Sequence, residues 1–267
     1  MKLKIKNYNE LSDLEKLSLV DFSYSRIDTY NSCPAKYFYS YIQKEPRSTN
    51  AAALLGNVVH SVLENTLENE KELSLAELQD EYNSNIKSWD TNNIISNELI
   101  NVGKVILDNF YDENQDTKFN ILDKEMEFDF IIGSYRVRGF IDRVDVFGNR
   151  IYIVDYKTGK WEVALKDVAT NLQLGIYALA ISELFPGKEV YAELYYLRSG
   201  KKKGHLFTSE EIFLVKKRLV ENIQKIINDN NFIPTTNTRI CSYCEHAQSG
   251  ACGVGGFRLR NSKAARY

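Results

Sequence analysis

The chain has 267 residues, 43% of them hydrophobic and 26% charged, a composition typical of folded globular proteins that excludes an intrinsically disordered chain. Its net charge of −2 excludes attraction to nucleic acid through overall charge, so any such binding must use local basic patches. The first twenty residues contain no apolar secretory stretch, and no run approaches the ~18 apolar residues of a membrane-spanning helix. We therefore expect a cytoplasmic protein with no membrane contact and with reduced cysteines.

The amino-terminal half is predicted to be mainly helical. Residues 1–20 form a polar, helix-prone lead-in. In the aromatic-rich residues 22–41, Ser25 could cap one helix and Pro34 could begin a second. Residues 52–70 carry an apolar face with helical spacing, which predicts a helix there; its members are Leu55, Val58, Val59, Val62, Leu63 and Leu67. A further helical stretch is expected over residues 75–111, broken near the Asn-rich residues 91–97.

Alternating patterns then predict strands. Three are expected over residues 119–132, 135–147 and 150–156, and short turns at 133–134 and 148–149 predict an antiparallel meander. The rest of the chain is expected to hold a helix, a hairpin around Ser199-Gly200, a last long helix and an irregular tail, over residues 168–184, 189–208, 208–228 and 233–267. The order of these elements indicates an α/β fold with a sheet flanked by helices.

Two aspartates and a lysine mark the meander as a candidate metal site. Asp155 and Lys157 fall on one face of their strand because residues i and i+2 point the same way. The short turn before that strand allows Asp142 to lie across from Asp155. Such carboxylates can bind Mg²⁺ or Mn²⁺, which can activate water for attack on a phosphodiester, with Lys157 stabilising negative charge. The alternative is a pair of solvated acids balanced by a lysine.

All four cysteines fit one scheme of metal ligation. Cys33 lies in the aromatic segment, and Cys241, Cys244 and Cys252 follow the last long helix as C-x2-C-x7-C. Cys241 and Cys244 have the spacing of a chelating pair. Four thiolates can bind zinc or an iron–sulfur cluster, and the residues alone favour zinc as the commoner ion. Unrelated buried thiols are the remaining alternative.

Several motifs occur in an order that resembles one enzyme family. They are G-N-V-V-H (56–60), G-F-I-D-R-V-D (139–145), I-V-D-Y-K-T-G (153–159) and Q-L-G-I-Y (173–177). The region from about residue 22 to 252 resembles the RecB-type branch of the PD-(D/E)xK nuclease superfamily. That resemblance implies a restriction-endonuclease-like core, with a central mixed sheet and an antiparallel meander flanked by helices, plus a cysteine-stapled cluster subdomain.

The resemblance also implies a division of the chain and roles for single residues. Residues 22–230 would form the nuclease domain, with a helical insertion at about 60–115 and a catalytic core at about 118–230, and residues 231–267 would join Cys33 in the cluster subdomain. The metal ligands would be His60, Asp142, Asp155 and the backbone carbonyl of Tyr156. Lys157 would be the catalytic lysine, with Gln173 and Tyr177 holding the DNA strand and the active site. Glu125 or Glu127 would match an acidic position of many relatives, and the sequence does not decide between them.

The AddB-type and CRISPR-associated relatives carry one cysteine before the nuclease core and three after it, and these hold a [4Fe–4S] cluster. The segment S-Y-S-R-I-D-T-Y-N-S-C-P-A-K-Y-F resembles their amino-terminal signature, so the resemblance favours iron–sulfur over structural zinc at Cys33, Cys241, Cys244 and Cys252. The C-x7-C interval is longer than is typical of those families.

The resemblance implies a Mg²⁺- or Mn²⁺-dependent deoxyribonuclease, an exonuclease on single-stranded or end-containing DNA. It would act in DNA repair, recombination or CRISPR adaptation, alone or with a helicase or CRISPR integrase partner. The chain has no phosphate-loop motif, so ATP-driven unwinding would need another protein. The alternative is a catalytically silent DNA-binding or assembly subunit, which predicts a damaged site, whereas every motif residue is present.

Two basic segments are candidate phosphate contacts. Arg198, Lys201, Lys202 and Lys203 surround the predicted hairpin turn, and four further cations lie in residues 257–267. Such patches contact phosphates without reading sequence, although a solvated turn and tail is the simpler interpretation. Some aromatic rings of residues 24–39 could stack on bases, although core packing is expected for most of them.

Overall fold

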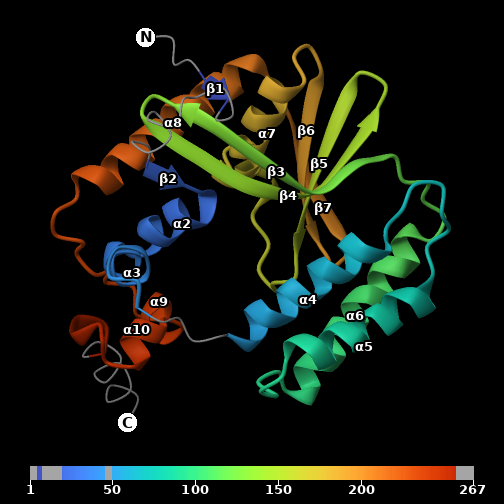
Figure 1. The fold of residues 1–267 in the computed structure, drawn as a ribbon, viewed down its shortest axis with the longest axis horizontal. Helices are drawn as coiled ribbons and strands as arrows, with labels where there is room; N and C mark the ends of the chain where they lie inside the picture. Colours follow the sequence, from blue (N-terminus) through green and yellow to red (C-terminus); the bar gives the residue numbers. More distant parts are fainter. Residues whose placement is uncertain (1–4, 8–19, 46–49, 257–267) are drawn as a thin grey trace.

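The computed structural model describes residues 5–7, 20–45 and 50–256 (Figure 1). A mixed sheet forms its centre, with the strand order β1-β3-β4-β5-β6-β7, and β2 pairs with β4 off this path. The strands are β1 (Ile5–Asn7), β2 (Val20–Phe22), β3 (Ile121–Ile132), β4 (Tyr135–Phe147), β5 (Arg150–Lys157), β6 (Glu189–Tyr196) and β7 (Lys201–Phe207). The predicted α/β class, with a mixed sheet flanked by helices, is confirmed.

The meander forms as the alternating pattern predicted. β3, β4 and β5 pair antiparallel in sequence order, joined by turns at Gly133 and Gly148, which both adopt positive φ as tight turns require. β6 then pairs parallel to β5, after a crossover through α7 (Leu172–Leu184), and β7 returns antiparallel. β5 therefore lies between two strands in the interior of the sheet, which explains its nearly continuous burial.

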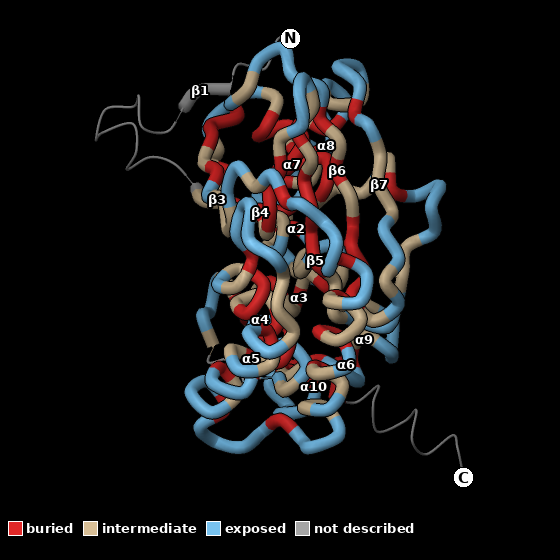
Figure 2. The backbone as a smooth tube through the Cα atoms, turned by 90° about the vertical axis from the view of Figure 1, so that its right-hand side faces the viewer, coloured by how far each residue is buried: buried red, intermediate tan, exposed pale blue. Residues whose placement is uncertain are grey.

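Helices cover both faces of the sheet, and each face has its own apolar core. The remaining helical segments are α2 (Tyr24–Ser32), α3 (Pro34–Tyr37), the π-helix η2 (Phe38–Ile42), α4 (Ala51–Thr66), α5 (Leu75–Trp89), α6 (Asn97–Asn114), the 3-10 turn η3 (Leu165–Asp167), α8 (Ser209–Asn228), α9 (Thr238–Ser242) and α10 (Glu245–Gln248). One core joins α2, α7 and α8 to residues such as Ile153, and the other joins α4, α5 and α6 to residues such as Val154 and Tyr156. β5 therefore alternates its side chains between the two cores, and Figure 2 shows the buried stretches along the central strands.

Several element boundaries differ from the expectation for local reasons. Ser23, not Ser25, caps α2, because its hydroxyl accepts from Arg26 N. The helix expected from residue 168 begins at Leu172, where Asn171 caps it after a 3-10 turn. Most of the helix-prone lead-in lies outside the described residues, and residues 5–7 form a strand. The tail is not wholly irregular, since α9 and α10 form beside α3 (Figure 1).

Of the helices in the described part of the chain, none combines the length and hydropathy needed to cross a membrane.

Candidate active site

Three potential metal ligands from separate elements converge beside the sheet. His60 projects from α4, Glu125 from β3 and Asp142 from β4, and one ligand atom of each lies within 4.8 Å of the others. His60 Nδ1 is 3.4 Å from Asp142 Oδ1. An imidazole nitrogen with two carboxylates is a donor set that suits a divalent cation such as Mn²⁺. The residues present therefore fit a bound divalent metal.

Asp142 lies where β4 and β5 separate. The last paired residues are Arg143 and Val154, and the next residue of β5 in register with Asp142 is Asp155. At this point Asp142 Oδ2 accepts the backbone N–H of Tyr156 at 2.7 Å. The two aspartates are thus close across the diverging strands, as the short turn predicted, and Asp142 is held by a backbone donor.

The structure distinguishes the two glutamates that the sequence left open. Lys124 pairs with Arg143 and Met126 with Ile141, so Glu125 lies opposite Asp142. Glu125 has a positive φ of 47°, a left-handed conformation that costs a non-glycine residue about 1–3 kcal/mol and is common at functional sites. Glu127 is exposed and pairs with Arg138 at 3.3 Å. Glu125 therefore faces the site and Glu127 does not.

A second group extends from Asp155 along α7. Asp155 is 2% exposed and forms an ion pair with Lys157, whose Nζ lies 2.6 Å from Asp155 Oδ2. Lys157 Nζ also donates to Gln173 Oε1 at 2.9 Å, and Gln173 Nε2 donates to the Tyr177 hydroxyl at 2.8 Å. The Asp155 carboxylate is therefore already paired with an ammonium, which also holds it beside Gln173.

Crowded acids shift the ionisation of the site. Burial, followed by the charge of Asp142, raises the pKa of Glu125 to about 7. Burial also raises the pKa of Asp155 to about 6, although the Lys157 ammonium opposes this shift. Burial alone would lower the pKa of His60, but the hydrogen bond and charge of Asp142 outweigh it and raise that pKa. Carboxylates that repel one another in a desolvated site are stabilised by a divalent cation.

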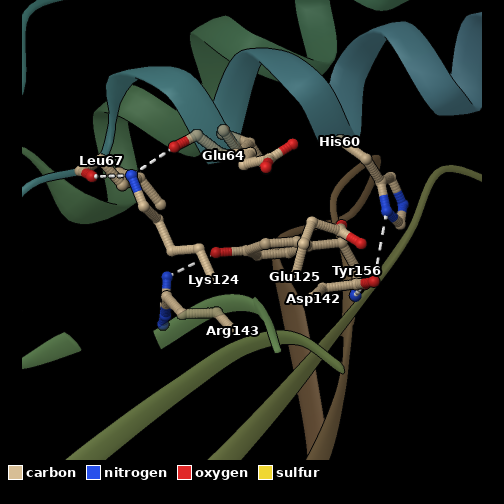
Figure 3. A pocket seen from close by; sticks show the side chains of 9 residues that line it. His60, Glu64, Leu67, Lys124, Glu125, Asp142, Arg143 and Tyr156 are labelled. Atoms are coloured by element: carbon tan, nitrogen blue, oxygen red, sulfur yellow. Dashed lines mark hydrogen bonds and ion pairs between the residues drawn. The ribbon is translucent and has the colours of Figure 1, made fainter. Parts of the chain in front are cut away.

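The wall of the pocket around Asp142 is fixed by buried polar contacts (Figure 3). His60 and Glu64 project from α4 toward Glu125, Asp142 and Tyr156. Lys124 ties β3 to the end of α4 by donating to the backbone carbonyls of Glu64 and Leu67. The Tyr156 ring also meets the His60 ring edge to face, with centroids 6.0 Å apart.

Two residues of α2 also approach the site, and sequence patterns alone did not single them out. Tyr24 and Asp28 share a hydrogen bond one helical turn apart, and burial and the charge of Asp28 raise the pKa of Tyr24 to about 12. The negative charge of Asp155 adds to the rise in the pKa of Tyr24. Burial raises the pKa of Asp28, and the positive charge of Lys157 partly opposes this rise. The i, i+4 spacing of an acid and a phenol just after a helix cap was the available signal. The other amino-terminal rings pack together instead, with Tyr30 and Tyr37 in edge-to-face contact at 5.7 Å.

The four cysteines are buried, and Cys33 contacts the segment that carries the other three. Cys33 ends α2, and its Sγ accepts the backbone N–H of Thr235 at 3.4 Å. Cys241 and Cys244 pack in one cluster with Ala247 in the carboxy-terminal segment. Cys252 Sγ accepts the backbone N–H of Gly255 at 3.4 Å. Backbone donors to sulfur suit thiolates that hold a metal or cluster.

The basic hairpin contacts this chain more than its sequence suggested. Arg198 Nε donates to the backbone carbonyl of Thr158, and Lys203 pairs with Glu162 at 2.8 Å. Lys201 lies 3.5 Å from Glu162, and Lys202 lies over the Tyr195 ring at 4.5 Å. Arg198, Lys201 and Lys203 therefore contact residues of the loop after β5. The basic residues of 257–267 lie outside the described residues.

Parts of this chain are similar in sequence to known proteins. An alignment 210 residues long, which covers 64% of this chain, shows 32% identity to a subunit of the ATP-dependent helicase/deoxyribonuclease from Carboxydothermus hydrogenoformans. A shorter region of 126 residues, 45% of the chain, is 26% identical to the Gene 69 protein of Mycobacterium phage L5. The matched regions span only 19% and 41% of the lengths of these two relatives.

A solved structure shows the same fold. The crystal structure of a candidate exonuclease from Eubacterium rectale superposes with a TM-score of 0.53 at 11% identity, covering 88% of this chain and 91% of that one. The family model described as the PD-(D/E)XK nuclease superfamily matches residues 21–249. That span contains His60, Glu125, Asp142, Asp155 and Lys157 on the diverging strands and α4. The chain belongs to the PD-(D/E)XK nuclease superfamily.

Proposed function

We propose that the protein is a Mg²⁺- or Mn²⁺-dependent deoxyribonuclease that hydrolyses phosphodiester bonds at the divergence of β4 and β5. The observation that carries this proposal is the convergence of His60, Glu125 and Asp142 within 4.8 Å, beside the Asp155–Lys157 ion pair at 2.6 Å. A silent DNA-binding protein is less well supported, because it would have no need to keep this complete set of charged groups in a partly desolvated site.

Each residue has a distinct proposed role. His60, Asp142 and Asp155 would hold the cation, with the backbone carbonyl of Tyr156, and Glu125 joins them because it faces Asp142. A bound divalent cation lowers the pKa of water and offsets negative charge on the phosphate. Lys157, 34% exposed and oriented by Asp155 and Gln173, would donate hydrogen bonds to the attacked phosphate. Gln173 and Tyr177 would keep that ammonium and the DNA strand in position.

The test is a cleavage assay on labelled single- and double-stranded DNA with Mg²⁺ or Mn²⁺. Asp155→Asn and Lys157→Ala should lower the rate about 10²- to 10³-fold, the usual effect of losing one group that stabilises transition-state charge. Lys188→Ala removes an exposed lysine that donates to the Gly148 carbonyl and should leave the rate unchanged. Equal rates for wild type and all variants would refute the catalytic assignment.

The substrate and pathway are part of the proposal. We propose exonuclease action on single-stranded or end-containing DNA, as the motif resemblance of the sequence implies. The name of the Carboxydothermus relative, which is part of a helicase/deoxyribonuclease, supports DNA as the substrate. We also propose a helicase or CRISPR integrase partner and a role in DNA repair, recombination or CRISPR adaptation. The name of the relative supports the helicase alternative, and the CRISPR alternative rests on the motif resemblance of the sequence alone. Circular and linear single strands distinguish the modes of action: an exonuclease degrades the linear DNA and leaves the circle intact.

We further propose that Cys33, Cys241, Cys244 and Cys252 hold a [4Fe–4S] cluster and that residues 231–256 form a subdomain with the end of α2. The four thiols are buried, and the sulfurs of Cys33 and Cys252 each accept a backbone N–H at 3.4 Å, which suits ligands of a metal or cluster. Anaerobic purification followed by iron and zinc analysis tests this, and a colourless protein with one zinc ion would overturn it.

A further inference from the structure

Trp161 is 90% exposed and Leu165 is 68% exposed, although both follow the active-site strand within a few residues. A tryptophan normally buries roughly 150–250 Å² of surface. Single exposed apolar side chains are normal, whereas apolar side chains exposed together can mark a contact with a ligand or partner. The indole of Trp161 therefore needs an explanation that the proposed chemistry does not give.

The loop that carries Trp161 is firmly held. Its neighbour Glu162 accepts a hydrogen bond from Ser199 Oγ at 2.8 Å and pairs with Lys203 at 2.8 Å. The backbone of Val163 is fixed on both sides, since its N–H donates to the Tyr196 hydroxyl at 2.9 Å and its carbonyl accepts from Lys203 Nζ at 2.8 Å. An exposed ring on a fixed loop loses little conformational freedom when it binds a ligand.

The same loop borders the active site at both ends. It begins directly after Lys157 and ends where Gln173 enters α7, and these two side chains are hydrogen-bonded to each other. Near its start it approaches α4, where a methyl group on Gly56 would lie 3.2 Å from Thr158 Oγ1. Figure 1 shows this segment leaving the end of β5, extending toward α4 and returning to α7. A strand bound at the active site would therefore pass close to this loop.

The charged side chains next to Trp161 and Leu165 indicate which class of ligand this loop would bind. Lys160 and Lys166, both exposed, flank the two apolar side chains in sequence, and Lys201 is exposed on the adjoining hairpin. Aromatic rings interleaved with cations are the chemistry that binds unpaired nucleic acid, because bases stack on the ring while phosphates meet the lysines. A protein-binding apolar patch would not need cations on both sides.

We propose that Trp161 stacks on an unpaired base of the DNA strand next to the scissile phosphate, with Lys160 and Lys166 contacting the neighbouring phosphates. The proposal rests on the proposed nuclease function and adds a subsite for single-stranded substrate. The hairpin cations Arg198, Lys201 and Lys203 then serve the substrate mainly by holding the loop that presents this ring.

Fluorescence tests this directly, because the chain has only two tryptophans. In a Trp89→Phe background, emission reports Trp161 alone. Oligo(dT) added in EDTA, which prevents cleavage, should quench this emission in a saturable way, and blunt duplex should quench it less. No quenching by oligo(dT), or an emission change that follows protein concentration without DNA, would overturn the proposal.

Binding by variants gives the second measurement. Trp161→Ala should raise the Kd for oligo(dT) about 5- to 150-fold, the range expected for one stacked base, whereas Trp161→Phe keeps a ring and should restore most of the affinity. Phe213→Ala removes a 55% exposed ring on α8 and should leave the Kd within about twofold. Equal Kd values for wild type and Trp161→Ala would refute stacking.

The cleavage assay separates this proposal from the nuclease proposal. A wild-type protein that cuts DNA but whose Trp161 does not respond to oligo(dT) refutes the stacking subsite alone. A protein that never cuts DNA but is quenched by oligo(dT) refutes the nuclease proposal and supports the subsite.

Discussion

The guanidinium of Arg143 donates a hydrogen bond to the hydroxyl of Tyr156 at 2.5 Å, in the interior beneath the proposed metal site. Arg143 is also paired with Asp145 at 3.1 Å and lies over the Phe119 ring at 5.0 Å. The backbone of the same Tyr156 donates to Asp142. Tyr156 thus contacts Arg143 through its side chain and the proposed metal ligand Asp142 through its backbone.

Because the side chain and the backbone of Tyr156 have different partners, Tyr156→Phe should affect stability and metal binding differently. Loss of the hydroxyl leaves a buried cation short of one acceptor, which should lower the free energy of unfolding by about 1–3 kcal/mol. Mn²⁺ affinity should stay unchanged, because the backbone N–H that holds Asp142 remains. Urea unfolding and calorimetric Mn²⁺ titration measure the two effects.

Tyr195→Phe is the matched control for that variant, since its hydroxyl accepts from Asn114 Nδ2 at 2.9 Å in the same core. It should reduce stability without touching the site. A folded Tyr156→Phe protein that no longer binds Mn²⁺ would show that the phenol, and not the backbone, sets the position of Asp142.

The two neighbouring glutamates should differ in effect. Glu125→Gln removes a carboxylate that lies opposite Asp142 and should weaken Mn²⁺ binding by at least about tenfold. Glu127→Gln, on the same strand but paired with exposed Arg138, should change it less than about twofold. Isothermal titration of both variants tests the placement, and similar losses in the two would contradict it.

A third prediction concerns the close packing between α7 and α8. A methyl group on Gly175 of α7 would lie 2.7 Å from Val215 Cγ2 on α8, so Gly175→Ala should destabilise the protein by about 1–3 kcal/mol. Because Gln173 and Tyr177 lie on the same helix, cleavage should slow as well. Adding Val215→Ala removes the clashing atoms and should restore part of the stability and part of the cleavage rate. If the two substitutions instead lower the free energy of unfolding additively, the clash is contradicted.

The anchor of the Trp161 loop can be tested through Glu162. Its hydrogen bond with Lys203, followed by that with Ser199, lowers the pKa of Glu162 to about 2. A lowered carboxyl pKa contributes stability above the unfolded-state pKa, which is lost as pH falls through the folded value. Trp161 emission should therefore be steady around neutral pH and change only in strong acid.

Glu162→Gln should weaken this anchor wherever the wild-type carboxylate is ionised, that is above pH about 2. It should also raise the Kd for oligo(dT), although by less than Trp161→Ala does. Glu189→Gln, which removes an exposed partner of Arg150, serves as the control and should bind as wild type. Unchanged binding by Glu162→Gln would show that the loop keeps its shape without the carboxylate.

Local chemistry in the sequence determined much of this protein. The two-residue period of a strand is intrinsic to its backbone, so the sequence alone placed Asp155 and Lys157 on one face, where they form an ion pair. The capping box of α8, in which Thr208 and Glu211 exchange hydrogen bonds, was also readable, because both partners lie within one turn. The motif order was enough to indicate the nuclease superfamily.

The tertiary structure decided what depends on distant partners. Glu125, rather than Glu127, faces the site because pairing with β4 and a positive φ turn it toward Asp142, and neither is encoded in a short window of sequence. The hairpin cations were candidate phosphate contacts, with a solvated turn as the simpler interpretation, and in the structure Glu162 and the Thr158 carbonyl engage three of them. Charge in a sequence shows that a cation exists, and only the fold decides which acceptor lies closest to it.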